Sequence, residues 1–144
     1  MRLGRLLVVL IVFALCVPAE AQQPKKVPRI GFLTASSVTS MATRTEALRQ
    51  GLRDLGYVEG KEIVIEYRYA GEKLDRLPAL AAELVRLKVD LIVSAGGAVT
   101  RAAKQATVTI PIVMAFDDDP VGSGFTASLA RPGGKHYRVI YTCP

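Results

Sequence analysis

The 144-residue sequence has few of the side chains that nucleophilic catalysis needs. It holds one histidine, His136, which lies close to the end of the chain. A Ser-His-Asp or Cys-His constellation is therefore unavailable anywhere else in the protein. This scarcity argues against hydrolase chemistry, although it leaves open enzymes that work with carboxylates alone.

The sequence also lacks an apolar run long enough to span a membrane. Its longest run, "LLVVLIVFALCV", falls short of the ~20 residues that a spanning helix requires. Arg2 and Arg5 precede the run, and an Ala-x-Ala site that ends at Ala21 follows it. This arrangement predicts a secretory signal peptide over residues 1–21, with a retained anchor as the alternative. A lipoprotein is disfavoured because Leu15 precedes Cys16, where lipid attachment normally requires a small residue.

Cysteine is scarce as well. Of the two cysteines, Cys16 lies in the predicted signal peptide, so only Cys143 remains after cleavage. The exported chain can form no internal disulfide. A free thiol at the end of an exported protein is unusual, which makes the last residues suspect.

No basic stripe interleaved with aromatic residues is present, so we predict no nucleic-acid partner. The formal charge is +6 and becomes +5 when Arg2, Arg5 and Glu20 leave with the signal peptide. The remaining basic residues alternate with acids and indicate a solvated surface. Residues 22–144 are enough for one domain with a single hydrophobic core.

Strands and helices alternate along the mature chain. "RIGFLTASS" predicts a strand that runs into a polar loop. A helix follows from about 39 to 55, with Gly56 as its cap and with apolar residues at helical spacing: Met41, Ala47, Leu48, Leu52 and Leu55. In "YVEGKEIVIEYRYA" a turn precedes a strand that places Ile63, Ile65, Tyr67 and Tyr69 on one face.

The next helix is the strongest, over "EKLDRLPALAAELVRLKV". Asp75 is its candidate cap and Pro78 lies in its first turn. Its inward-facing residues are predicted to be Leu77, Leu80, Leu84, Val85 and Val89.

Two buried strands come next, "DLIVSAGG" and "IPIVMAF", separated by a helix in "AVTRAAKQAT". The loop "DDDPVGSG", a short helix "FTASLA" and the stop "RPGG" complete the pattern. Strands joined by crossover helices predict an α/β protein with a doubly wound, mostly parallel, flavodoxin-like sheet. Ligands of such sheets bind beyond the carboxyl ends of the strands, here at 34–37, 95–100 and 117–124.

Three loops carry the candidate ligand-binding residues. Gly96 and Gly97 let the backbone approach a ligand, and the helix that follows favours a carboxylate or phosphate; a tight turn is the equal alternative. The loop fits neither a Walker loop nor a dinucleotide fingerprint. Ser36 or Ser37 is predicted first as a helix N-cap, and also as a residue that lines the cleft.

The third loop is acidic. Asp118 and Asp119 are predicted to accept from a ligand ammonium or hydroxyl group, with turn formation at Asp119-Pro120 as the alternative. A magnesium site is disfavoured because the neighbouring loops hold no acid, and we predict neither a metal nor a cofactor.

Five segments together resemble a bacterial family. They are "IGFL", "ALRQGLRDLGYVEGKEIVIEYRYA", "DRLPALAAELVRLKVDLIVSAGG", "IPIVMAF" and "DPVGSGFTASLARPGG", and they extend from Pro28 to Gly134. The pattern is similar to the extracytoplasmic substrate-binding proteins of ABC transporters, of the tryptophan type. The resemblance implies the N-terminal lobe of a two-lobed, type I periplasmic binding protein that closes over a small solute.

The resemblance further implies a non-enzymatic protein of the periplasm that delivers its solute, possibly an amino acid, to permease subunits in the inner membrane. We expect a monomer, because nothing in the sequence indicates oligomerisation. The family's Gly-Thr-Pro loop is Gly97-Ala98-Val99 here, so a hydroxyl is lost, and Thr100 is its candidate substitute. The Asp-Pro-Val motif is kept at 119–121, whereas Asp118 replaces a small or hydroxyl residue. The extra acid favours a cationic group in the ligand.

The last ten residues, "KHYRVIYTCP", depart from the family's continuation, which resembles Asn-Ile-Thr-Gly followed by a second lobe. When one base is deleted from a suitable back-translation of the tail, it reads Asn-Ile-Thr-Gly-Ser-Ser-Thr-Leu-Ala. We therefore expect 22–134 to be the lobe and 135–144 a frameshifted tail, with the chain truncated before the second lobe. A natural short protein is the alternative, since "YRVIY" favours a strand at the sheet edge.

Two other functions remain open from the sequence. A secreted flavodoxin-like enzyme or domain would use the Gly96-Gly97 loop for a phosphate-bearing ligand. An inactive fragment would bind no solute, because the facing lobe is missing.

Overall fold

Strands and helices alternate in the computed structural model, which describes residues 26–116 and 137–139. The order along the chain is β1 (Arg29–Thr34), α2 (Val38–Asp54), β2 (Val64–Tyr69), the 3₁₀ turn η1 (Leu74–Arg76), α3 (Leu77–Arg86), β3 (Leu91–Ala95), α4 (Gly97–Ala106), β4 (Ile112–Phe116) and β5 (Tyr137–Val139).

The strands form one parallel sheet in the order β2-β1-β3-β4-β5. This is the flavodoxin-like strand order, so the predicted fold class is confirmed. The chain moves from β1 to one side of the sheet to form β2 and then returns past β1 to form β3. The topological switch point therefore lies between β1 and β3.

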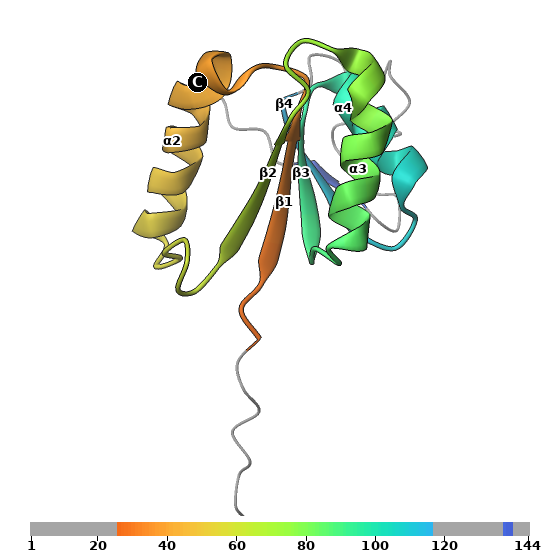
Figure 1. Ribbon diagram of the computed structural model, residues 1–144. Coiled ribbons are helices and arrows are strands. Elements are labelled where there is room, and N and C mark those ends of the chain that lie inside the picture. Colours follow the sequence, from red (N-terminus) through yellow and green to blue (C-terminus); the bar gives the residue numbers. More distant parts are fainter. Residues whose placement is uncertain (1–25, 117–136, 140–144) are drawn as a thin grey trace, which may run out of the picture.

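Helices cover both faces of the sheet. Figure 1 shows α2 alone on one side, and α3 and α4 together on the other. Successive residues of a strand face opposite sides, so Phe32 packs in the cluster beneath α2 whereas Leu33 packs beneath α3 and α4.

The two faces have cores of different chemistry. The α3/α4 face is aliphatic, built from leucine, isoleucine, valine and alanine. The α2 face includes the rings of Phe32, Tyr67 and Tyr69, of which the two tyrosines stack with centroids 6.2 Å apart. The predicted row Ile63, Ile65, Tyr67 and Tyr69 belongs to this second cluster, so its placement on one face is confirmed.

Helix α2 turns a narrower apolar face to the sheet than its sequence indicates. Met41 and Thr45 are buried, but Ala47 is exposed and Leu55 is 75 % exposed. The helix ends in a Schellman motif: the amide of Gly56 donates to the carbonyl of Arg53, and the amide of Tyr57 to that of Leu52. Gly56 has a φ of 86° and so takes the terminating role predicted for it, one position after the cap residue Leu55.

Helix α3 begins differently from the prediction. Pro78 lies in the first turn as expected, but Asp75 lies within η1, the N-cap residue is Arg76, and no side chain caps the helix. Val85 is only half-buried, whereas the other four predicted inward-facing residues are buried. The 3₁₀ turn runs directly into α3 and so takes the place of a side-chain cap at the start of the helix.

A close contact fixes α3 on the sheet. A Cβ atom at Gly31 of β1 would lie 2.9 Å from the Cδ1 atom of Leu84. A side chain at this position would force Leu84 to move, so glycine lets α3 lie this near to the strand.

Several predictions fall outside the described residues: the signal peptide, the loop 117–124 with Asp118 and Asp119, and the helix 125–130. Within the tail, Tyr137–Val139 pairs with β4 as the edge strand β5, at the position favoured for "YRVIY". None of the helices in the described part of the chain is long and apolar enough to cross a membrane.

Candidate functional site

The carboxyl ends of β1 and β3 lie side by side at the switch point. Thr34 and Ala95, the last residues of the two strands, are register partners. The loop Ala35–Ser37 leads from β1 into α2, and Gly96 leads from β3 into α4. Because these helices cover opposite faces, both begin beside the crevice where doubly wound sheets bind their ligands (Figure 1).

Helix α2 begins with a side-chain cap. Ser37 is the N-cap, as predicted, and its Oγ accepts from the amide of Ser40 at 3.2 Å. The amide of Ser37 donates in turn to the Oγ of Ser40 and to the Oε1 of Glu72. This capping box occupies the amides of Ser37 and Ser40 within the protein.

The loops after β1 and β2 are bonded to each other. The amide of Gly71 donates to the carbonyl of Ser36, and the amide of Glu72 donates to that of Ala35 at 2.7 Å. Within the first loop, the amide of Ser36 donates to the Oγ1 of Thr34. Ser36 and Ser37, both candidate ligand residues, thus lie in a loop that is hydrogen-bonded to the loop after β2 and to Thr34 at the end of β1.

Helix α4 begins without a side-chain cap. Its N-cap is Gly96, at φ 108° and ψ 152°, and no side-chain hydrogen bond closes the first turn. Gly97 is partly exposed and Ala98 is exposed. Amides in the first turn of a helix lack partners within the helix, and no other described residue bonds those of Gly97 and Ala98. Within the described part of the chain, these two amides are available to a group at the edge of the sheet. An oxyanion is the natural guest because the helix dipole adds partial positive charge there.

Thr100, the fourth helix residue and a candidate for ligand contact, has its hydroxyl inside the protein. Its side chain is fully buried, and its Oγ1 lies 2.8 Å from the Oγ of Ser94 and 3.1 Å from the carbonyl oxygen of Gly96. Ser94 is also fully buried. The structure therefore places the Thr100 hydroxyl beneath the loop instead of on its surface.

The pairing of β3 with β4 shifts register at the same place. Ser94 pairs with Met114, but Ala95 pairs with Phe116, so Ala115 is an extra residue in β4. Such bulges alter the direction of a strand and are common beside functional sites. Asp118 and Asp119 follow this bulge in the sequence, outside the described residues.

Sequence reasoning missed Ser94 and Glu72. A serine within the apolar run "DLIVSA" was a usable signal, because a buried hydroxyl in a central strand needs a partner. Glu72 offered no local signal, because its bond to Ser37 joins residues 35 positions apart. Among the described residues, no group of three or more histidine, cysteine or acidic side chains could hold a metal ion.

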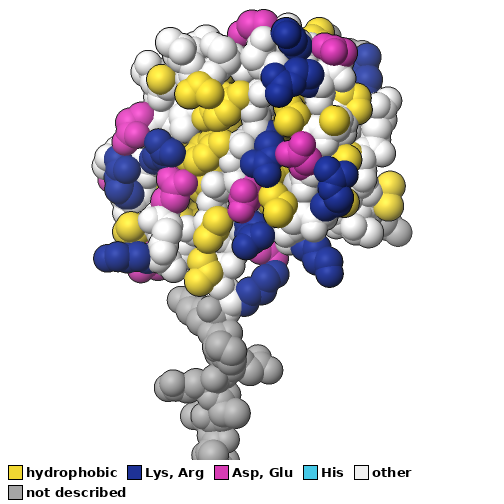
Figure 2. Space-filling model, in the orientation of Figure 1, with side chains coloured by type: hydrophobic (Ala, Val, Ile, Leu, Met, Phe, Trp, Pro, Cys, Tyr) yellow, Lys and Arg dark blue, Asp and Glu magenta, His cyan; other side chains and the backbone are white. Residues whose placement is uncertain are grey.

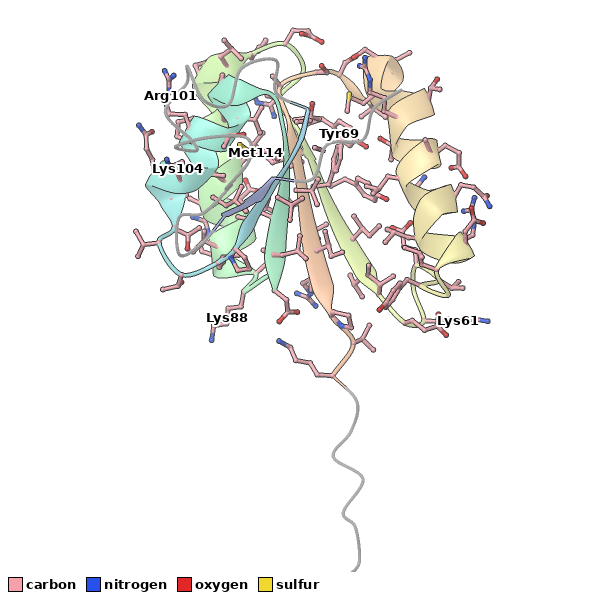
Figure 3. The ribbon with its side chains drawn as sticks, turned by 180° about the vertical axis from the view of Figure 1, so that it is seen from behind. Lys61, Tyr69, Lys88, Arg101, Lys104 and Met114 are labelled. Carbon is pink, nitrogen blue, oxygen red and sulfur yellow. The ribbon has the colours of Figure 1, made fainter. Side chains whose placement is uncertain are left out.

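Tyr69 is an aromatic residue at this edge. Figure 3 shows it at the carboxyl end of β2, on the side of α2, whereas Lys61 and Lys88 lie at the opposite edge of the sheet. Its hydroxyl lies 3.5 Å from the Oγ1 of the buried Thr45.

A cavity of about 240 Å³ lies away from this edge. It is lined by Arg49, Leu52, Arg53, Tyr57, Val58, Glu59, Ile63 and Ile65, from the end of α2 to the start of β2. Beside it, the Tyr67 hydroxyl accepts from the Nε of Arg49 and donates to Glu59. Burial, aided by the charge of Glu59, raises the pKa of Tyr67 to about 12.

Charges of both signs are mixed on the visible surface. Figure 2 shows lysine and arginine side chains interspersed with acids over the face that it presents. This distribution agrees with the interpretation of the net positive charge as a solvated surface.

A family model described as ABC transporter substrate binding protein matches residues 29–136. The chain belongs to this family. The match runs from the first residue of β1 past the end of β4 and stops one residue before β5.

The chain is similar to proteins of known function and to proteins of known structure. It is 33% identical over 111 residues to a tyrosine-binding protein of Clostridioides difficile (strain R20291), covering 77% of the chain and 32% of that relative. A ligand-free, open structure of CD0873, a Clostridium difficile substrate-binding protein with adhesive properties, matches at 25% identity and a TM-score of 0.71, over 78% of the chain and 38% of that structure.

Two further structures agree in fold. A conserved domain protein of Vibrio cholerae matches at 27% identity and a TM-score of 0.72, and an ABC domain of Streptococcus pneumonia in complex with L-Trp at 24% and 0.71. Each match covers 79% of the chain and 38% of the other structure. The chain thus spans about a third of the length of the relatives it matches.

Proposed function

We propose that this protein is the solute-binding component of an ABC importer and that its solute is an amino acid with an aromatic side chain. Family membership supports a binding role over an enzymatic one. The relative with 33% identity is a tyrosine-binding protein, which supports the class of solute.

The observation that carries the proposal to particular atoms is the uncapped start of α4 at the switch point. In this proposal the amides of Gly97 and Ala98 donate to the solute's carboxylate, and Gly96 keeps side-chain atoms away from it. Ser36 and Ser37 line the opposite side of the crevice. Asp118 and Asp119, in the third loop, accept from the solute's ammonium group.

In the same proposal the described lobe forms one wall of the site, and a second lobe closes over it. The chain spans about a third of its relatives' length, so the affinity of this lobe alone is expected to be weak. The protein acts as a monomer in the periplasm after removal of residues 1–21, and delivers its solute to permease subunits in the inner membrane.

An NMR titration of the purified, ¹⁵N-labelled chain tests the proposal. L-tyrosine and L-tryptophan should shift the amide signals of Gly97 and Ala98 and leave those of Lys61 and Lys88, at the opposite edge, unchanged. Tyramine, which is tyrosine without its carboxylate, is the matched control ligand and should leave all four signals unchanged.

Two results would contradict the proposal. Tight binding of flavin mononucleotide, without a response to amino acids, would favour the flavodoxin-like alternative. No response to any of these ligands, from a chain that gives the spectrum of a folded protein, would favour an inactive fragment.

A further inference from the structure

Two buried hydroxyl groups join β3 to α4 directly beneath the loop at the switch point. Ser94 lies in the strand and Thr100 in the first turns of the helix, and both side chains are fully buried. Their oxygens are 2.8 Å apart, which is a full-strength O–H···O hydrogen bond. Valine or alanine would fit these core positions without a hydrogen-bonding requirement, so the pair calls for a reason beyond packing.

The available protons fix the direction of the bonds. The Oγ1 of Thr100 donates to the carbonyl oxygen of Gly96 at 3.1 Å, which uses the one hydrogen of the Thr100 hydroxyl. Ser94 is then the donor to Thr100, because its other acceptor, the carbonyl oxygen of Val113, is farther away at 3.5 Å. The bonds run in series from Ser94 to Thr100 to Gly96, an order in which each bond polarises the next.

The carbonyl of Gly96 is therefore held twice from below. It accepts from the amide of Thr100 at 3.0 Å, as in any helix, and from the hydroxyl of the same residue. The carbonyl of Gly96 and the amide of Gly97 belong to one planar trans peptide unit, in which they point in opposite directions. When the carbonyl points into the helix, the Gly97 amide must point out of it.

The hydrogen bond from the Thr100 hydroxyl to the Gly96 carbonyl matters because Gly96 lies in a sparsely populated backbone conformation. Its φ of 108° and ψ of 152° are open almost only to glycine, and glycine by itself would also adopt many others. Among the described residues, no side chain caps the first turn of α4. Within the described residues, the buried hydroxyl pair is thus the side-chain contact that restrains this peptide unit.

We propose that Ser94 and Thr100 are positioning residues that hold the Gly97 amide toward the crevice, where it receives a carboxylate. The part concerning the carboxylate rests on the proposed function. Neither side chain touches the solute; both act through the Gly96–Gly97 peptide unit. This assigns Thr100 a role different from direct replacement of the family's lost hydroxyl.

The ligand-free chain provides the first test, using the N–H residual dipolar coupling of Gly97. Thr100→Val removes the hydroxyl at nearly constant volume and should change this coupling. Thr100→Ser keeps a hydroxyl able to reach Gly96 and should restore the wild-type value. An unchanged coupling in Thr100→Val would overturn the proposal, whether or not the protein binds an amino acid.

Solute binding provides the second test. Thr100→Val should weaken L-tyrosine binding about tenfold, the equivalent of one hydrogen bond to a charged group. Ser94→Ala should have a smaller effect, because the bond from Thr100 to Gly96 survives. The double variant should bind no more weakly than Thr100→Val, since the bonds act in series; additive losses would contradict the series.

Thr107→Val is the matched control. Thr107 is also buried, and it caps the other end of α4, where its Oγ1 accepts from the amides of Thr109 and Ile110. This variant should lower the melting temperature and leave the Gly97 coupling and L-tyrosine binding unchanged. Equal losses of binding in both valine variants would reduce the role of Thr100 to general stability and overturn the proposal.

The two failures can be told apart. If the wild-type chain binds no amino acid but the Gly97 coupling depends on the hydroxyls, the proposed function fails and the positioning role stands. If the wild type binds L-tyrosine and Thr100→Val binds it equally well, the positioning role fails and the proposed function stands.

Discussion

Helices α2 and α4 start at the same edge of the sheet, after neighbouring strands, yet their first turns are opposite in character. The first turn of α2 is closed by Ser37 and Ser40 and by the carboxylate of Glu72. The first turn of α4 follows Gly96 and has no side-chain cap. Two equivalent positions in one topology thus differ in whether a described side chain caps the first turn.

The largest loss of stability and of binding is expected from a substitution of Gly96, whose backbone conformation opens the first turn of α4. Gly96→Ala should destabilise the protein by about 1–3 kcal/mol, because φ is 108° and the cost is backbone strain, with no atom within 4 Å of the added Cβ. It should also abolish the amide response of α4 to L-tyrosine. Thermal unfolding and NMR titration measure the two effects.

Gly51→Ala is the control for that substitution. Gly51 lies inside α2, and an added Cβ would likewise meet no atom within 4 Å. Alanine should raise the stability by about 0.5–1 kcal/mol because the helix interior favours it. If Gly96→Ala raised the stability as Gly51→Ala does, the claim that the backbone conformation at Gly96 requires glycine would be wrong.

Removing the cap of α2 should lower the stability less than Gly96→Ala does, and it should not abolish the amide response of α4 to L-tyrosine. Ser37→Ala deletes the acceptor for the amide of Ser40 and should cost about 1 kcal/mol in the free energy of unfolding. Because Ser37 also lines the proposed crevice, L-tyrosine should bind more weakly, but the Gly97 amide should still shift at saturation. Loss of that response in Ser37→Ala would show that the two helix starts are not independent.

High pH should destabilise α2 more than α4, because the two helices pack on cores of different chemistry. The pKa of Tyr67 is about 12 in the folded protein and about 10 in the unfolded chain, so the neutral form favours folding. This contribution is complete below pH 10 and is lost as the pH rises toward 12. Amide hydrogen exchange in α2 should then accelerate more than in α4, whose face is aliphatic.

Tyr67→Phe removes the titrating group and is the control for the alkaline effect. The fall in stability between pH 10 and 12 should be shallower in this variant than in the wild type. Identical pH profiles would assign the loss to groups elsewhere in the protein.

The smallest expected effect uses a simple carboxylate. Acetate should shift the Gly97 and Ala98 amide signals with weak affinity, since a helix dipole contributes only about 0.3–1 kcal/mol to such binding. The amide signal of Ser40 should not move, because its donor is occupied by Ser37. Equal shifts at both helices would remove the distinction between a closed and an open start.

Most of the fold could be predicted from local sequence. The alternation of Ile63, Ile65, Tyr67 and Tyr69 fixed one face of a strand, and an apolar run bounded by glycines marked β3. Local periodicity was less reliable at helix surfaces, where Ala47 and Leu55 fit the pattern but lie exposed. Only the position of the sheet decides which part of an apolar stripe is covered.

The candidate site could be predicted as a set of loops but not as a set of contacts. Ser37 was recognisable as a cap from its place before a helix. The inward direction of the Thr100 hydroxyl depends on Ser94 and on the glycine conformation between them, which no spacing rule encodes. The bond from Ser37 to Glu72 depends on two loops that only the strand order brings together.

The bonded loops after β1 and β2 have a thermodynamic consequence. Because Gly71, Glu72 and Ser36 already hold one another in place, a solute that meets this wall does not have to order it. The entropy lost on association then falls mainly on the solute and on whatever closes over it. In the proposed function, the entropy of solute binding should accordingly change little when the wall is stiffened further, and should become more unfavourable when its bonds to Glu72 are removed.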